Sequence, residues 1–326
     1  MKVAFVGKGG SGKTTLSALF CRYLAALQFP VIAFDADINQ HLAEALGLME
    51  GDAALIPPLG SEIERIKEYL RGTNPRITSV AAMAKTTPPG QGSRLWRVRE
   101  KNPLLSYFGR HVDGVTLFMT GPFSEQDLGL KCYHSKVGAV ELLLNHCLDG
   151  SCEYIVVDMT AGADSFASGL FTKFDMTFLI VEPTRKSLGV YYQYTEYARN
   201  YNVQLGVIAN KVETQDDLDF VRKQVGDDLL AWVWRSDYVR AMEKGDKLPF
   251  SKLEAHNCSA LEMMRQAVDD CQQDWDRFYQ QTVEFHRKNA LAWINGSVGE
   301  DVTQQIDPDF SLRTLLHQQT EVLLHS

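Results

Sequence analysis

The start of the chain constrains its fold more than any other feature. An apolar run at residues 3–6, VAFV, leads directly into residues 7–15, GKGGSGKTT. A buried strand, a glycine-rich turn and a lysine followed by hydroxyl residues at a helix start together form a phosphate-binding loop, whose backbone N–H groups point at phosphate oxygens. The segment therefore predicts a site for a nucleoside triphosphate and Mg²⁺ at the end of the first strand.

The residues of this loop divide into side-chain and backbone ligands. Lys13 would reach the β- and γ-phosphates, and the Thr14 hydroxyl would ligate Mg²⁺. Backbone N–H groups around them would bind further phosphate oxygens. The predicted nucleotide-binding residues of the loop are Gly9, Gly10, Ser11, Gly12, Lys13, Thr14 and Thr15.

A second lysine in the loop, Lys8, indicates which class of phosphate-binding loop this sequence resembles. With Lys8, the sequence K-G-G-x-G-K-T resembles the deviant phosphate loop of the ParA/MinD/nitrogenase-iron-protein (SIMIBI) class of ATPases. The resemblance implies a homodimer in which Lys8 crosses the subunit interface and touches the partner's nucleotide. Because a cation there offsets charge that builds up during phosphoryl transfer, Lys8 and Lys13 are both candidate catalytic residues.

Strand-like apolar runs recur along the chain and predict an α/β fold. They lie at residues 2–6, 31–34, 115–119, 154–157, 176–181 and 204–209, separated mostly by segments of helix length. Strands that alternate with helices form a mostly parallel sheet with helices on both faces, here a P-loop NTPase fold. Ligands bind at the carboxyl ends of such strands, so the residues directly after each run are candidates for the site.

Carboxylates follow two of these runs. Asp35 and Asp37 follow the second run, and Asp158 follows the fourth, Y-I-V-V. Asp158 matches a Walker B aspartate, which holds Mg²⁺ through water, and Gly162 would donate its N–H to the γ-phosphate. The resemblance implies that Asp37 orients or deprotonates the attacking water and that Asp35 lies near Mg²⁺. Which of these two aspartates has which role is left open.

Asn210 and Lys211 follow the sixth run and are candidate nucleotide-binding residues. An asparagine amide can bond both N6 and N7 of adenine, which favours ATP. GTP-selective relatives carry an acidic residue in an N-K-x-D arrangement. Glu213 stands two residues after Lys211, so GTP remains the alternative.

Cys132 and His134 form a candidate metal site. Their placement, ahead of the Walker B strand, resembles the Cys-x-Cys element of the CooC-like nickel-insertion ATPases that mature carbon monoxide dehydrogenase. In that group two such pairs face each other across the dimer and hold one metal ion. Thiolate and imidazole are competent ligands for Ni²⁺ or Zn²⁺. The alternative is that the cysteine is a small core residue and the histidine is merely hydrogen-bonded.

Composition and charge exclude some partners. A net charge of −8 argues against broad binding to nucleic acid or to an anionic membrane. The apolar runs are interrupted by charge well before the length of about 18 residues that a transmembrane helix needs. The six cysteines are dispersed and the chain begins at a core strand with no signal-peptide pattern, which predicts a reduced, cytoplasmic protein.

The chain divides into two predicted domains. Residues 1–257 would form the ATPase domain, in which residues 52–110 exceed a simple crossover and include a Pro/Gly-rich stretch. This stretch predicts a surface insertion or lid, or else a plain surface loop. Residues 258–326 predict a helical C-terminal extension, whose aromatic stripe either packs on the body or contacts a partner.

The resemblance as a whole implies a Mg²⁺-dependent ATPase that dimerises with nucleotide and serves as an accessory or maturation factor for a client metalloenzyme. Two alternatives stand beside it. A ParA/MinD-like positioning ATPase would need a basic surface or an amphipathic membrane helix, which the acidic chain does not suggest. A client-directed regulatory protein would bind ATP without a metal.

Overall fold

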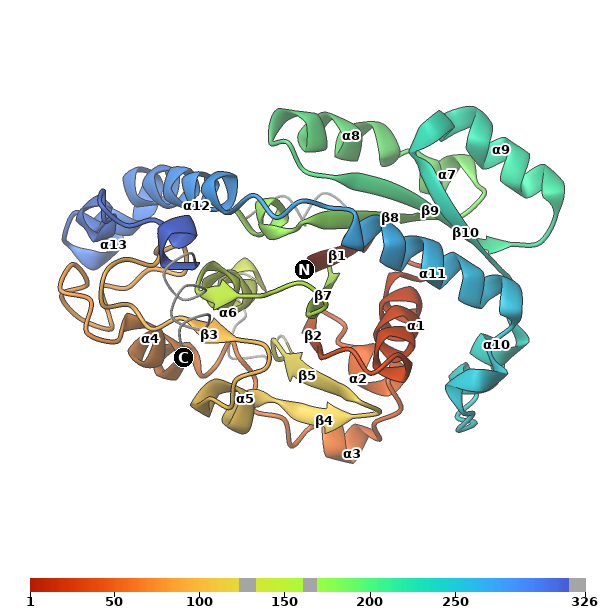
Figure 1. The fold of residues 1–326 in the computed structure, drawn as a ribbon, viewed down its shortest axis with the longest axis horizontal. Helices are drawn as coiled ribbons and strands as arrows, with labels where there is room; N and C mark the ends of the chain where they lie inside the picture. The colour runs from red at the N-terminus through yellow and green to blue at the C-terminus, as the bar shows by residue number, and fades with distance from the viewer. Residues whose placement is uncertain (123–132, 161–168, 317–326) are drawn as a thin grey trace, which may run out of the picture.

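The computed structural model describes residues 1–122, 133–160 and 169–316, apart from the side chains of Glu50 and of residues 133–135 (Figure 1). Its centre is an eight-stranded sheet in the order β10-β9-β8-β1-β7-β2-β5-β4. The strands are β1 (Lys2–Gly7), β2 (Val31–Ala36), β4 (Arg110–Val112), β5 (Val115–Met119), β7 (Tyr154–Met159), β8 (Met176–Val181), β9 (Leu205–Val212) and β10 (Leu229–Trp234). Every pairing is parallel except that of β4 with β5. The predicted, mostly parallel α/β sheet is confirmed.

All six predicted strand runs coincide with strands of this sheet, the sixth beginning one residue before β9, and other strands were not predicted. β10 adds an outer strand beyond β9, and β4 adds an antiparallel strand at the opposite edge. A separate two-stranded sheet joins β3 (Trp96–Arg97) and β6 (Cys147–Leu148) in parallel.

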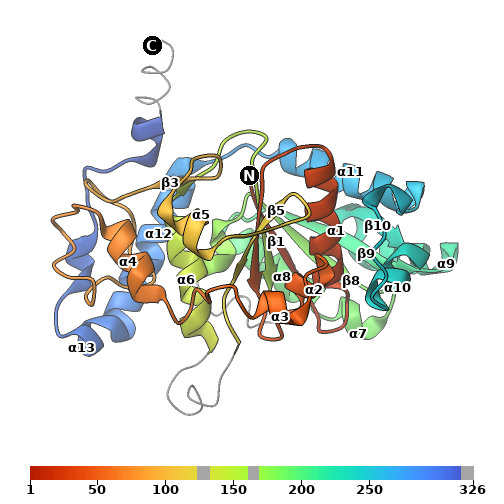
Figure 2. The ribbon, with the colours of Figure 1, turned by 90° about the horizontal axis from the view of Figure 1, so that it is seen from below.

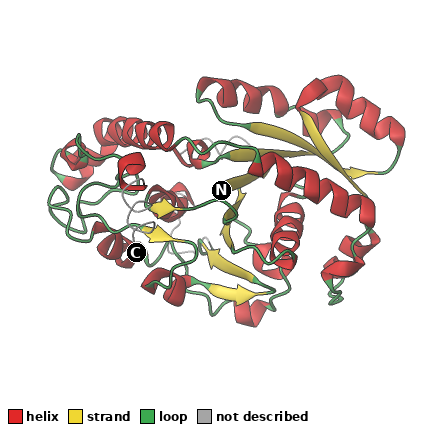
Figure 3. Cartoon of the chain, viewed as in Figure 1, coloured by secondary structure: helices red, strands yellow, loops and turns green. Residues whose placement is uncertain are grey.

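Helices cover both faces of the sheet, as the continuous apolar strands require (Figures 2 and 3). Along β1, Ala4 and Val6 enter one hydrophobic cluster and Val3 and Phe5 enter the other, because side chains alternate across a strand. One face packs against α1 (Lys13–Ala26), α2 (Leu42–Ala45), α10 (Asp237–Glu243) and α11 (Ala255–Asp269). The other packs against α4 (Ile63–Arg71), α5 (Pro103–Phe108), α6 (Tyr133–Asn145), α8 (Tyr191–Asn200) and α9 (Gln215–Val225). The short α3 (Glu50–Ala53) follows α2.

The Pro/Gly-rich stretch of the middle segment is buried, so the prediction of a surface loop or lid is wrong for residues 82–90. Thr86 Oγ1 lies 3.0 Å from His286 Nδ1, and Thr87 Oγ1 donates to Gln305 Oε1 at 2.7 Å. Gln91 N donates to the carboxylate of Asp307 at 2.9 Å. The C-terminal extension covers this stretch and supplies the partners for its polar groups.

The C-terminal extension begins on the sheet. Asn257 of α11 bonds both backbone atoms of Trp234 in β10, at 2.9 and 3.2 Å. The predicted domain boundary after residue 257 therefore falls inside α11. Next come α12 (Trp275–Asn289), a π-helical turn (Ala290–Ile294) and α13 (Asn295–Val298), which lie at the end of the molecule that carries α4 and β3 (Figures 1 and 2).

The aromatic residues of α12 pack on the body, as the first of the two interpretations predicted, whereas Trp293, at the end of the predicted stripe, is 50% exposed. Phe285 contacts Phe171 and Tyr201, with ring centroids 5.9 and 5.5 Å apart. Trp275 and Phe278 receive the ammonium of Lys2, which lies 4.5 and 4.9 Å from their ring centroids. Burial of these rings fixes α12 to the body.

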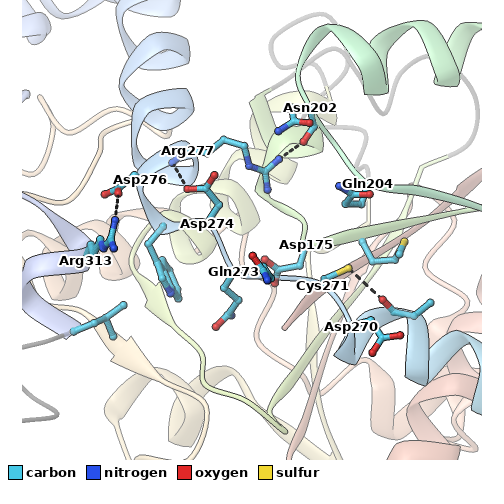
Figure 4. A pocket seen from close by; sticks show the side chains of 15 residues that line it. Asp175, Asn202, Gln204, Asp270, Cys271, Gln273, Asp274, Asp276, Arg277 and Arg313 are labelled. Carbon is cyan, nitrogen blue, oxygen red and sulfur yellow. Dashed lines mark hydrogen bonds and ion pairs between the residues drawn. The ribbon is translucent and has the colours of Figure 1, made fainter.

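A cavity of about 890 Å³ lies where the chain between α11 and α12 passes the amino-terminal end of β8 (Figure 4). Arg277 donates to the backbone oxygen of Asn202, and Arg313 pairs with Asp276 at 3.1 Å. This cavity lies at the amino-terminal end of β8, whereas the phosphate-binding loop follows the carboxyl-terminal end of the parallel strand β1.

A buried ion pair joins the amino-terminal end of β1 to the extension. The Lys2 ammonium donates to Asp149, and Gln273 Nε2 donates to the same carboxylate at 2.6 Å. Both charged side chains are buried. Burial alone would raise the pKa of Asp149, but the Lys2 ammonium and the N-terminal ammonium of Met1, which both pair with its carboxylate, together outweigh burial and lower the pKa.

Replacing Asp149 with asparagine should lower the free energy of unfolding by about 3 kcal/mol, because the buried Lys2 ammonium loses its counter-charge. Folding lowers the pKa of Asp149, so the pair stabilises the fold above the pKa of an unfolded aspartate. That stability is lost as pH falls through the folded pKa. Urea unfolding at neutral and acidic pH measures both effects.

Asp113→Asn is the matched control, because Asp113 pairs with Arg22 but its side chain is 49% exposed. Its loss should cost less than about 1 kcal/mol. Equal losses for the two variants would show that the Asp149 pair contributes no more than a surface pair.

Candidate functional site

The phosphate-binding loop has a positive φ, which favours glycine, at three positions. Gly7, Gly10 and Gly12 have φ of +145°, +85° and +91°. A Cβ on Gly12 would lie 2.2 Å from Asn210 Nδ2. The left-handed turn at Gly12 leads directly into α1 at Lys13, so the unpaired N–H groups of the helix start lie next to the loop. The predicted strand-loop-helix arrangement is present.

Side chains from β9 hold the loop from outside. Asn210 Nδ2 donates to the backbone oxygen of Ser11 at 2.8 Å, and Lys211 Nζ donates to that of Gly10 at 2.7 Å. The Asn210 amide thus uses one of its hydrogens on the loop and keeps its oxygen and second hydrogen for another partner. The predicted adenine contact of Asn210 stays a prediction, and the loop contact is a role that sequence reasoning missed.

Asp158 is buried at the end of β7 and faces the loop. Its Oδ2 accepts a bond from Thr14 Oγ1 at 2.6 Å, and within the described residues its Oδ1 has no hydrogen-bond partner. Burial raises the pKa of Asp158 to about 7, against the effects of the Thr14 bond and the Lys13 charge. The Ser11 hydroxyl is also buried with no partner in that part of the chain. The unpartnered oxygen of Asp158 and the Thr14 hydroxyl beside this carboxylate are hard oxygen donors, which fit Mg²⁺.

The two aspartates after β2 differ in their surroundings. Asp35 lies opposite Asp158 in the register of β2 and β7, and its two oxygens accept the N–H groups of Asp37 at 3.3 Å and Leu42 at 3.0 Å. Burial, and after it the negative charge of Asp158, raise the pKa of Asp35 well above its usual range. Asp37 Oδ1 accepts two bonds from Asn39, at 3.0 and 3.2 Å. Asp35 therefore shapes the loop that presents Asp37.

The two loop lysines also differ. Lys13 is 5% exposed and lies close enough to Asp158 to oppose the rise of its pKa. Lys8 is half-buried, and its Nζ donates to the backbone oxygen of Lys186 at 3.3 Å. Lys186 belongs to α7 (Arg185–Leu188), which follows β8. In the single chain Lys8 therefore lies on the β8–α7 turn.

A cavity of about 300 Å³ opens beside Thr14 and Thr15. Residues of α1, α2 and α10 line it. Apolar and aromatic side chains such as Leu19, Tyr238 and Met242 form one part of the lining, and the ionisable side chains of Arg22, His41, Glu44 and Glu243 form another. Its size and lining suit the flat ring of a nucleoside base. Asn210 is not among the lining residues. Sequence reasoning missed the α10 residues of this cavity. The feature of the sequence that could have indicated them is the apolar pattern directly after β10.

Some predicted site residues lie outside the described part of the chain. These are Gly162 and Cys132; His134 belongs to the first turn of α6, but its side chain is outside as well. Within residues 1–122, 133–160 and 169–316, no group of three or more His, Cys, Asp or Glu side chains could hold a metal ion. The same part of the chain has no helix of the length and apolar character that crossing a membrane demands.

Comparison with known proteins gives a family and relatives. The family described as CobQ/CobB/MinD/ParA nucleotide binding domain matches residues 3–248. An uncharacterized ATP-binding protein of Methanocaldococcus jannaschii is 29% identical over 238 residues, which cover 72% of this chain and 84% of the relative. The carbon monoxide dehydrogenase accessory protein CooC of Rhodospirillum rubrum is 26% identical over 222 residues, which cover 68% of this chain and 78% of CooC.

The fold is similar to solved structures. The septum site-determining protein MinD of Pyrococcus horikoshii, solved in complex with Mg-ADP, has a TM-score of 0.52 and 16% identity. The likeness covers 82% of this chain and 95% of that protein. It shows that the two chains share a fold.

Replacing Gly12 with alanine should weaken ADP binding at least about tenfold. The new Cβ displaces the Asn210 amide from the loop, and the left-handed backbone at residue 12 becomes strained. Titration with a fluorescent ADP analogue measures the affinity. Gly299→Ala is the matched control, because Gly299 has φ of +82° with nothing within 4 Å. Unchanged ADP affinity in Gly12→Ala would contradict the placement of the phosphates in this loop.

Proposed function

The chain belongs to the CobQ/CobB/MinD/ParA nucleotide-binding domain family, and from this we propose that it is a Mg²⁺-dependent ATPase that works as a nucleotide-dependent homodimer. The observation that carries the proposal is the Thr14–Asp158 contact of 2.6 Å beneath a phosphate-binding loop, with the second carboxylate oxygen of Asp158 left without a partner in the described residues. A hydroxyl and a buried carboxylate at the end of adjacent elements are the two protein ligands that a nucleotide-bound Mg²⁺ uses.

The roles of the residues follow from their positions. The N–H groups of residues 9–15, apart from that of Ser11, which donates to the oxygen of Lys8, would bind phosphate oxygens, with Lys13 on the β- and γ-phosphates. Thr14 and Asp158 would hold Mg²⁺, which when bound neutralises charge on the phosphates. Asp37, presented by the loop that Asp35 shapes, would orient the attacking water and accept its proton. Gly162 would contact the γ-phosphate from the segment after β7.

Dimerisation would complete the site. Within the described residues Lys8 is held by one long bond of 3.3 Å to a carbonyl, which costs little to break. In a dimer with nucleotide, its ammonium would instead contact the partner's phosphates and offset charge in the transition state. The loops that carry Asp37 and Gly162 would both contact the γ-phosphate. Because hydrolysis removes these contacts, it would release the two subunits from each other.

We further infer that the ATPase serves as an accessory factor for a metalloenzyme, and that Cys132 and His134 of both subunits bind Ni²⁺ or Zn²⁺ between them. Two observations support this. The relative CooC is named as an accessory protein of carbon monoxide dehydrogenase. In addition, α6 begins at Tyr133, between Cys132 and His134 in the sequence, and along the chain it follows β5 and precedes β7, the strand that carries Asp158.

Asp37→Ala should bind ATP like the wild type but hydrolyse it at least about a hundredfold more slowly, because the water loses its positioning carboxylate. The variant should therefore accumulate as a dimer with ATP·Mg²⁺. Phosphate release and light scattering measure the two effects. Lys13→Ala is the comparison and should bind no nucleotide and stay monomeric. Normal hydrolysis by Asp37→Ala would refute the role of Asp37.

The wild-type dimer formed with ATP·Mg²⁺ should hold about one Ni²⁺ or Zn²⁺ per two chains, because each chain supplies half of a four-ligand set. Cys132→Ala combined with His134→Ala should lose the metal and keep ATP binding. Elemental analysis of the purified dimer measures the ratio, with Cys152→Ala as a control for an exposed cysteine. A metal-free wild-type dimer would favour a client-directed or positioning ATPase instead.

A further inference from the structure

An ion pair on the outer side of the phosphate-binding loop has no role in the function proposed so far. Lys211 Nζ lies 2.7 Å from the backbone oxygen of Gly10 and 2.7 Å from Glu182 Oε1. Glu182 follows β8, and its own N–H donates to Ser187 Oγ at 2.9 Å. One lysine therefore connects the loop to the β8–α7 turn.

Lys211 adopts an unusual backbone conformation to make these contacts. Its φ of +58° is in the left-handed region, which costs a side chain other than glycine about 1–2 kcal/mol. The strand β9 continues on both sides of it. Backbone strain persists at a functional site where the surrounding structure holds the residue in that conformation. Here the strained backbone of Lys211 directs its side-chain ammonium toward the Gly10 carbonyl of the loop.

The Gly10 contact fixes one peptide unit of the loop. Because a peptide is planar and trans, its C=O and N–H point in opposite directions. The oxygen of Gly10 is held by Lys211, and the N–H of the same peptide, on Ser11, donates to the oxygen of Lys8 at 3.1 Å. The following peptide is held through its oxygen by Asn210. The peptides Gly10–Ser11 and Ser11–Gly12 thus have their orientation set by side chains from outside the loop.

The negative charge of Glu182 is unfavourable near a phosphate site unless the carboxylate has a structural role, which here is its ion pair with Lys211. A carboxylate near a polyphosphate site opposes anion binding by Coulomb repulsion. Lys211 is 51% exposed, and a long exposed lysine side chain samples many rotamers unless it is held at its end. Glu182 supplies that hold, and the lysine in turn neutralises its charge.

We propose that Glu182 is a positioning residue of the nucleotide site: it keeps Lys211 on the Gly10 carbonyl and so holds the phosphate-binding loop in its binding conformation. This rests on the proposed nucleotide function. Glu182 touches neither nucleotide nor water in this assignment, and it acts only through Lys211.

The test compares ADP·Mg²⁺ affinities of purified full-length variants. Glu182→Ala should weaken ADP binding about fivefold or more, and Glu182→Gln, which keeps an oxygen acceptor, should lose less. Lys211→Met should weaken binding at least as much as Glu182→Ala. Because Glu182 acts through Lys211, adding Glu182→Ala to Lys211→Met should change the affinity no further.

Two further readouts separate positioning from general stability. The melting temperature without nucleotide should be nearly the same for Glu182→Ala and the wild type, because Lys211 is exposed and Glu182 is only half-buried. In steady-state ATP hydrolysis the KM should rise while kcat changes less, since the loop holds phosphates before and during the reaction. Glu284→Ala is the matched control, because Glu284 forms an exposed pair with Lys288 at 2.5 Å, away from the loop.

Three outcomes would overturn the proposal: wild-type affinity in Glu182→Ala, tighter binding in that variant, or additive losses in the double variant. Tighter binding would mean that Glu182 holds Lys211 away from the phosphates. If the wild-type protein itself binds no ADP or ATP, the proposed function fails, and this result is distinct from the others because it appears before any variant is compared.

Discussion

The parallel register of β7 with its neighbours is the constraint on which the candidate site depends. Asp158 lies opposite Phe5 of β1 and opposite Asp35 of β2. Parallel strands end at the same edge of a sheet, so this register brings the phosphate-binding loop, the Asp158 carboxylate and the loop of Asp37 to one ligand. A slip of β7 by one residue would turn Asp158 to the other face and remove the Thr14 contact.

The same register places two buried carboxylates side by side, which is unfavourable without a cation. Burial raises the pKa of both Asp35 and Asp158, and each is surrounded by elements of the core. A bound divalent cation would relieve this repulsion, and anything that binds only the folded state also stabilises it. Ligand binding and fold stability are therefore linked through the end of β7.

The sequence was informative where chemistry requires fixed spacing or where a strand is buried on both sides. The loop glycines, Thr14 and Asp158 follow this pattern, and the structure brings them together. It was uninformative where partners are remote in the chain. Thr86 meets His286 across 200 residues, so the burial of a Pro/Gly-rich stretch leaves no local signal. The base-sized cavity is missed for the same reason, since α1 and α10 meet only in the fold.

The C-terminal extension is best understood as part of the body that carries the site. The ammonium of Lys173, which is buried, donates to Thr282 of α12 at 2.6 Å and lies 5.2 Å from the ring centroid of Phe278. Lys173 ends the 3₁₀ helix Gly169–Lys173, which leads into β8. A Cβ on Gly169 would lie 2.7 Å from Glu141 of α6. The contacts of Lys173 and Gly169 therefore connect α12 and α6 to the 3₁₀ helix that leads into β8, so a shift of α12 would disturb the start of that strand.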